Sequence, residues 1–168
     1  MSVLEHSKKK QFHALLDRQE TTVRRVCRMY FGDSESAKDL YQDIIIKLWE
    51  HFGELKDQQV EQDWVYTIAR HTATDHYRKQ RRTMISSPPP PSVAEIAICE
   101  DPHEEKLEEL YKVIRILEPE EKELIYLYLD HHTLAQIANR KRTAEALLDH
   151  LIAFHYLDIF SRNKNRYQ

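Results

Sequence analysis

The chain has 168 residues, and its two Gly and two Cys argue against folds built on tight β-turns, Gly-rich phosphate loops or disulfides, and against a Cys-type zinc site. No apolar run reaches the ~20 residues of a membrane span and the polar, basic start is not a signal peptide, so we expect a cytoplasmic, helical protein without membrane insertion. The net charge of -3 divides into +2 for residues 1–82, -8 for 83–130 and +3 for 131–168, so any contact with nucleic acid must be made by a local face.

Apolar residues at helical spacing predict three helices in the first half of the chain. We expect them over residues 9–31, 37–52 and 63–82. Gly32 suits the C-cap of the first helix, and Asp33 or Ser34 can cap the second. Three helices of this length predict one compact bundle, which we assign to residues 1–83.

Four consecutive prolines, Pro88–Pro91, interrupt the helical pattern because Pro lacks an amide donor and favours an extended backbone. They predict a flexible, Pro-rich and acidic linker over residues 84–103. Two short helices joined by a turn at 131–133 then indicate a helix-turn-helix domain over 104–168. The helices of this second domain are expected near residues 107–117, 118–129, 134–138 and 143–160. The predicted fold class is all-α, with two small helical domains.

A polar edge is expected on the second predicted helix, beside its apolar stripe. It consists of Asp39, Gln42 and Asp43, whose carboxylate and amide acceptors can meet a basic partner helix. The alternative is a solvated helix edge, which such charges usually form. Trp49 is expected in the core or at an interface rim rather than stacked on a base.

The third predicted helix has two unlike sides when its residues are placed about 100° apart. The side expected to face the core holds Trp64, Val65, Ile68, Ala69 and Thr72. The opposite side holds Arg70, His71, Thr74, Arg78 and Arg81. A stripe of Arg with hydrogen-bonding residues between suits phosphate contact and base-edge reading. The alternative is a face that only solubilises the helix.

Two segments of the first domain resemble bacterial sigma factors. The first segment, DLYQDI at residues 39–44 with KLW at 47–49, resembles the region of these factors that binds core RNA polymerase. The second segment consists of WVYTIAR at 64–70 and DHYR at 75–78, followed by the basic Arg81–Arg82. It resembles the next segment of the small extracytoplasmic-function sigma factors.

A weaker resemblance to the fourth domain of the same family follows after the linker. Leu117 and Pro119 are similar to its Leu-Pro opening, and TLAQIA at 133–138 to its Ser-x-x-Glu-Ile-Ala turn. Together, the resembling segments cover most of the chain in the expected order.

The resemblance implies a sigma factor of the extracytoplasmic-function (group IV) type with a divergent fourth domain, which is not an enzyme and needs no cofactor or metal. It implies binding to core RNA polymerase through the β′ clamp and the β flap, recognition and melting of the minus-ten element of promoter DNA, and sequestration by an anti-sigma factor. The implied polymerase contacts are Asp39, Gln42, Asp43, Ile45 and Trp49. The implied DNA contacts are Trp64, Arg70, His71, Thr74, Arg78, Arg81, Arg82, Arg140, Lys141 and Arg142.

Acidic residues cluster at two places that matter for this reading. By resemblance, the segment 52–63 holds a base flipped out of the duplex, and its acids suit base edges better than phosphates. These acids are Glu54, Asp57, Glu61 and Asp63. A second cluster, at 104–109, is explained either as helix formers at a helix start or as a negative strand that mimics nucleic acid inside the polymerase.

Some residues depart from the family pattern. His71 stands where the family has Asn, so a promoter preference cannot be carried over. Arg140–Arg142 are the best phosphate ligands of the fourth domain, but Glu145 and Asp149 stand where the family presents Lys and Arg. Whether this domain reads a minus-thirty-five element stays open. The alternative function is a sigma-like interaction module that binds an anti-sigma regulator without reading DNA through its fourth domain. An enzyme is not expected, because the sequence offers no complete set of catalytic residues.

Overall fold

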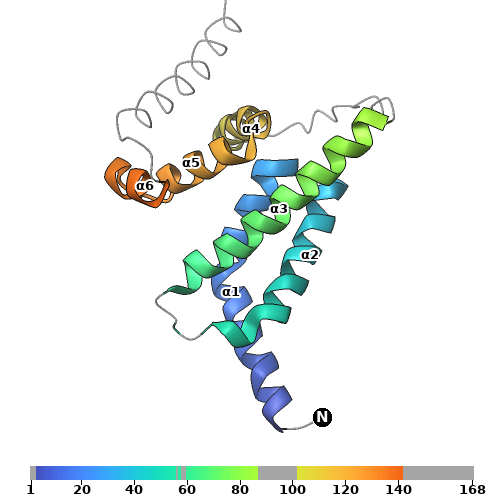
Figure 1. Cartoon of the computed structure of the whole chain (residues 1–168), viewed down its shortest axis with the longest axis vertical. Helices are drawn as coiled ribbons and strands as arrows, with labels where there is room; N and C mark the ends of the chain where they lie inside the picture. Colours follow the sequence, from blue (N-terminus) through green and yellow to red (C-terminus); the bar gives the residue numbers. More distant parts are fainter. Residues whose placement is uncertain (1–2, 56, 58–59, 87–101, 142–168) are drawn as a thin grey trace, which may run out of the picture. The chain divides into compact units, whose positions relative to one another are not determined.

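The computed structural model describes residues 3–55, 57, 60–86 and 102–141, and every regular element in these ranges is helical (Figure 1). The predicted all-α class is therefore confirmed. The chain divides into two compact units, Met1–Ile98 and Cys99–Gln168, which are taken one at a time below. Across the described ranges, none of the helices combines the length and the apolar character needed to cross a membrane.

The first unit is a bundle of three long helices, drawn from blue to green in Figure 1. They are α1 (Val3–Phe31), α2 (Glu35–His51) and α3 (Glu61–Ser86), with a short 3-10 helix, η1 (Phe52–Glu54), directly after α2. Each long helix packs against the other two. The three predicted helices are confirmed, although α1 begins before residue 9 and α3 continues through Ser86 into the segment assigned to the linker.

Apolar side chains at intervals of three and four residues form the core of this bundle. The buried positions of α2 are Ala37, Leu40, Ile44 and Leu48. The helices on either side of it contribute Leu15, Val23 and Val26 from α1 and Val65, Ala69 and Ala73 from α3. Burying one Leu or Val side chain contributes about 1.5–3 kcal/mol. Tertiary packing of these stripes, rather than intrinsic helix propensity, therefore holds the helices together.

A tight turn joins α1 to α2. Gly32 ends α1 with a φ of 64°, and its amide donates to the carbonyl of Arg28 at 3.0 Å. Ser34 then caps α2, because its hydroxyl accepts from the amide of Ala37 at 3.3 Å. Both predicted caps are confirmed, and of the two candidates for the second it is Ser34 that acts.

The second unit contains α4 (Pro102–Arg115), α5 (Pro119–Leu129) and α6 (Leu134–Lys141). Glu104 and Glu105 lie in the first turn of α4, where acids suit the positive end of the helix dipole. Thr133 and Gln136 cap α6 reciprocally, with backbone-to-side-chain hydrogen bonds of 2.8 and 3.2 Å. The helix predicted near 143–160 lies outside the described residues.

Candidate functional site

One side of α2 presents the predicted polar edge to solvent. Asp39, Gln42 and Asp43 are all exposed. Ile46 lies on the same side, and its side chain is 53% exposed. Sequence reasoning missed Ile46, although three consecutive Ile at 44–46 cannot all face the core of one amphipathic helix. We call these four residues the α2 face.

Asp43 also links α2 to α3. Its Oδ2 lies 2.5 Å from Nε2 of His76, and the two side chains are 52% and 28% exposed. Part of the hydrogen-bonding capacity of Asp43 is thus used inside the bundle, while the rest of the carboxylate faces solvent. His76 belongs to the DHYR segment, but its contact with Asp43 was not predicted, because the two residues lie 33 positions apart in the sequence.

Ile45 and Trp49 are half-buried and lie on the flank of α2 next to the α2 face. The ring of Trp49 meets that of Phe12 edge-on, with 5.1 Å between centroids. Nζ of Lys8 lies 4.8 Å from the centroid of the Trp49 ring, in a cation–π contact. Trp49 therefore closes the seam between α1 and α2, in keeping with its interpretation as a core or rim residue.

A second candidate surface is a basic stripe along α3. His71, Arg78, Arg81 and Arg82 are exposed, and Arg70 is half-buried. Nη2 of Arg70 lies 2.7 Å from Nε2 of His71. Because a guanidinium can only donate, Nε2 of His71 accepts and its Nδ1 carries the proton. We call these five residues the α3 basic face.

The predicted division of α3 into two sides was partly wrong. Thr74, expected beside Arg70, is only 8% exposed, and its hydroxyl lies 3.2 Å from that of Tyr30 on α1. Tyr66 and Ala73 are buried, whereas Trp64, Ile68 and Thr72, expected in the core, are half-buried. The reason is that α3 packs against both α1 and α2, so its buried sector is wider than one stripe and turned toward Thr74.

The acidic segment before α3 is also used differently from what was expected. Glu61 is 4% exposed, and both of its carboxylate oxygens accept from Arg18, at 3.1 and 2.7 Å. Gln19 donates to the same carboxylate at 3.0 Å. These hydrogen bonds, above all those from Arg18, lower the pKa of the Glu61 carboxyl below its usual value. Glu61 is thus an internal anchor, and both of its carboxylate oxygens already accept hydrogen bonds from Arg18.

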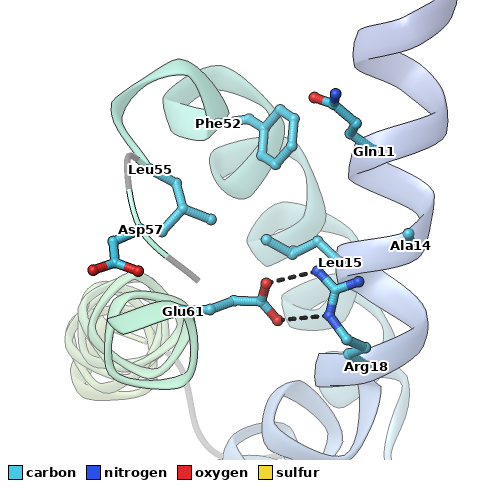
Figure 2. Close-up of a pocket in the computed structure, with 8 residues that line it drawn as sticks. All are labelled: Gln11, Ala14, Leu15, Arg18, Phe52, Leu55, Asp57 and Glu61. Atoms are coloured by element: carbon cyan, nitrogen blue, oxygen red, sulfur yellow. Dashed lines mark hydrogen bonds and ion pairs between the residues drawn. The ribbon is translucent and has the colours of Figure 1, made fainter. Parts of the chain in front are cut away.

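A pocket of about 270 Å³ opens between α1 and the segment that follows α2 (Figure 2). Its apolar lining comes from Ala14, Leu15, Phe52 and Leu55. Its polar lining comes from Gln11, Arg18, Asp57 and Glu61. One water occupies about 30 Å³ in the liquid, so the pocket has room for a small planar organic group. Mixed apolar and hydrogen-bonding walls are typical of a site that holds such a group.

Residues 15–83 match the family model for sigma-70 region 2. The match begins within α1 and ends within α3, so it covers both faces described above. The match spans less than half of the 168 residues, so it shows a likeness to sigma-70 region 2 over this part of the chain. The comparison with curated proteins found no match.

The second unit lies beyond the sigma-70 region 2 match. Of its predicted DNA contacts, Arg140 is exposed near the end of α6. Lys141 is half-buried, and its Nζ forms an ion pair with Glu123, which is 7% exposed. Lys141 is therefore already engaged inside its own unit. Arg142, like Glu145 and Asp149, lies outside the described residues.

Proposed function

We propose that this protein is a sigma factor of the extracytoplasmic-function type, which binds core RNA polymerase, recognises a minus-ten promoter element and helps to open the duplex. The observation that carries the proposal is the sigma-70 region 2 match over a bundle with an acidic face on α2 and a basic face on α3. Both faces belong to one compact unit. A single small domain can therefore contact the polymerase and the promoter at the same time.

The α2 face is the proposed polymerase contact. Exposed Asp39 and Asp43 can accept charge-assisted hydrogen bonds from a basic helix of the β′ clamp. Ile46 supplies the apolar centre that a stable protein interface usually has. Ile45 and Trp49 act in this proposal at the rim, where half-buried side chains border the contact.

The α3 basic face is the proposed promoter contact. Arg78, Arg81 and Arg82 can bind phosphates and fix the position of the duplex. Arg70 and His71 lie closer to the start of α3, and their side chains are coupled by a hydrogen bond. With Nε2 occupied by Arg70, His71 offers its Nδ1 proton to an acceptor on a base edge. Thr74 is left out of this contact because it is buried.

The pocket between α1 and the segment after α2 is the proposed place for a base flipped out of the duplex. Flipping costs a few kcal/mol of stacking and pairing, which a shaped pocket has to return. Phe52 and Leu55 offer apolar surface to the faces of a ring, and Gln11 and Asp57 offer polar groups to its edge. Minus-ten melting would then follow from capture of one base of the separated strand.

The second unit is proposed to contact the β flap and an anti-sigma factor. The ion pair between Lys141 and Glu123 specifically favours the alternative in which this unit binds a regulator rather than DNA, because it removes a cation from the predicted phosphate ligands. Whether this unit reads a minus-thirty-five element is tested by the affinity of the holoenzyme for a promoter with that element present and for one with it scrambled.

Paired variants test the two faces separately. Asp39→Ala is expected to weaken binding to core RNA polymerase about tenfold or more, as at other interface hot spots, while Glu35→Ala on the first turn of the same helix is the matched control. Arg78→Ala is expected to leave core binding intact, to weaken promoter binding by the holoenzyme and to lower the slope of its salt dependence by about 1. Arg24→Ala on α1 is its control.

Two outcomes would contradict the proposal. One is wild-type protein that does not bind core RNA polymerase in a direct titration. The other is a pattern in which each control variant loses as much binding as the variant it is matched with, because the losses would then reflect general damage to the bundle.

A further inference from the structure

The segment between α2 and α3 is fastened to α1 at both of its ends. At the first end, the ring of Phe52 meets that of Phe12 edge-on, with 5.3 Å between centroids. At the second end, Glu61 forms its two-pronged ion pair with Arg18. Phe12 and Arg18 are six residues apart, which corresponds to about 9 Å along a helix axis. Phe52 from the first anchor and Arg18 and Glu61 from the second all line the pocket, and Figure 2 shows Phe52 set apart from the Arg18–Glu61 pair.

The second anchor is built more firmly than a surface ion pair. Glu61 is almost fully buried, and three hydrogen bonds of 3.1, 2.7 and 3.0 Å hold its carboxylate. Gln19, which provides one of them, itself accepts from the hydroxyl of Thr22 at 3.1 Å. Four side chains thus fix one geometry at the start of α3. Such a network sets orientation in a way that an exposed, mobile pair does not.

The Arg18 side chain serves the pocket as well as the anchor. It is 48% exposed, and Arg18 lines the pocket together with Glu61. In Figure 2, Arg18 and Glu61 stand together at one end of the pocket, with Leu15 beside them. A change at Arg18 therefore alters the wall of the pocket and the attachment of α3 together, while the α2 face is made by a different helix.

We propose that Arg18 and Glu61 are positioning residues for promoter opening, which hold the start of α3 against α1 and keep the pocket in the shape that captures the flipped base. This inference rests on the proposed function. It assigns to α1 a role in strand opening that is separate from polymerase binding. Loss of the pair leaves the α2 face intact and weakens base capture.

The test compares holoenzymes on single-stranded minus-ten oligonucleotides in which each base in turn is replaced by an abasic site. For the wild type, one position is expected to lower affinity roughly tenfold, within the range measured for stacking of one base. For Arg18→Met, the same replacement is expected to change affinity less than about twofold, because capture is already lost. Arg24→Met is the matched control, since Arg24 is an α1 arginine paired with Glu20 on its own helix.

Stability is controlled with a second variant. Arg18→Met/Glu61→Gln removes the buried charge that the single variant would leave without its main partner, so it is expected to fold if Arg18→Met does not. The double variant should lose the effect of the abasic site to the same extent as Arg18→Met. Core RNA polymerase binding by either variant should stay within about twofold of wild type, since the α2 face is unchanged.

The outcomes separate this inference from the proposed function. An abasic penalty that is equal in wild type and variants, or a loss of core binding that parallels the loss of capture, would overturn the positioning role alone. A wild type that binds core and starts transcripts but shows no abasic penalty at any position would also overturn the positioning role alone. A wild type that does not bind core overturns the proposed function and this inference with it.

Discussion

Thr74 marks the boundary between core and surface on α3. It lies next to Ala73, which is fully buried, and its hydroxyl meets that of Tyr30 across the bundle. Arg70, one turn earlier, keeps part of its side chain in solvent. A polar residue that the sequence placed among DNA contacts is thus part of the packing between α1 and α3.

Replacing Thr74 with Val tests this assignment. The shape is nearly kept, but the hydrogen bond to Tyr30 is lost, so the free energy of unfolding should fall by about 1 kcal/mol in urea titrations. Promoter binding by the folded holoenzyme should not change, in contrast to Arg78→Ala. A specific loss of promoter affinity without loss of stability would return Thr74 to the DNA interface.

Lys122 is the most deeply buried lysine among the described residues, at 1% exposed. Its Nζ donates to the carbonyl of Arg115, the last residue of α4, and to that of Leu117 in the connection to α5. Burial lowers the pKa of Lys122 from 10.5 to about 8. Between these two pH values the unfolded chain binds more protons than the folded chain, so this group makes stability rise as pH increases.

The expected pH effect is measured by difference. From pH 7.5 to 9.5, the free energy of unfolding of the wild type should rise relative to that of Lys122→Met by on the order of 1 kcal/mol, because partial solvation reduces the full electrostatic value. Urea titrations followed by circular dichroism at both pH values give the comparison. Parallel pH dependences for the two proteins, or a fall of the wild type relative to Lys122→Met, would refute the assignment.

Which individual residues were predictable depends on how local their determinants are. Gly32 and Ser34 were predictable because caps follow rules that operate within four residues. Glu61 was not, because its partner Arg18 lies 43 residues earlier and nothing in the local pattern distinguishes it from the exposed acids nearby. The exposure of Ile46 could have been predicted, since three consecutive Ile cannot all lie on one buried stripe of a helix.

At the scale of elements, the turn between α1 and α2 sets the angle at which the α2 face is presented. Gly32 has a φ of 64°, which an L side chain adopts only at a cost, whereas Gly53 in η1 has open space around it. The existence and order of the helices followed from apolar periodicity. The extent of the buried sector of α3 did not, because it depends on how many neighbours the helix has.

The two glycines provide a matched pair of substitutions. Gly32→Ala should lower the free energy of unfolding by about 1–2 kcal/mol, the cost of a left-handed backbone for a residue with a Cβ. Gly53→Ala should be nearly neutral, because an added methyl group meets nothing within 4 Å. Thermal unfolding of both variants checks this. Equal destabilisation by the two substitutions would contradict the role given to Gly32.

At the scale of the whole molecule, the two compact units carry different features. The first carries the sigma-70 region 2 match, the α2 face, the α3 basic face and the pocket. The second has its own capped helices and a buried lysine, and it lies beyond the matched residues. The net charge of -3 therefore says little about the partner, because the cations of α3 are gathered on one face of one unit.

The central claim is that this protein gives core RNA polymerase the ability to start at defined promoters. The most direct measurement is transcription in vitro with purified core polymerase from the same cell and a set of its genomic fragments, with and without the wild-type protein. The account predicts transcripts with fixed 5′ ends that appear only when the protein is present and that share a sequence upstream. It would be contradicted by a protein that neither binds core polymerase nor yields a specific transcript on any fragment.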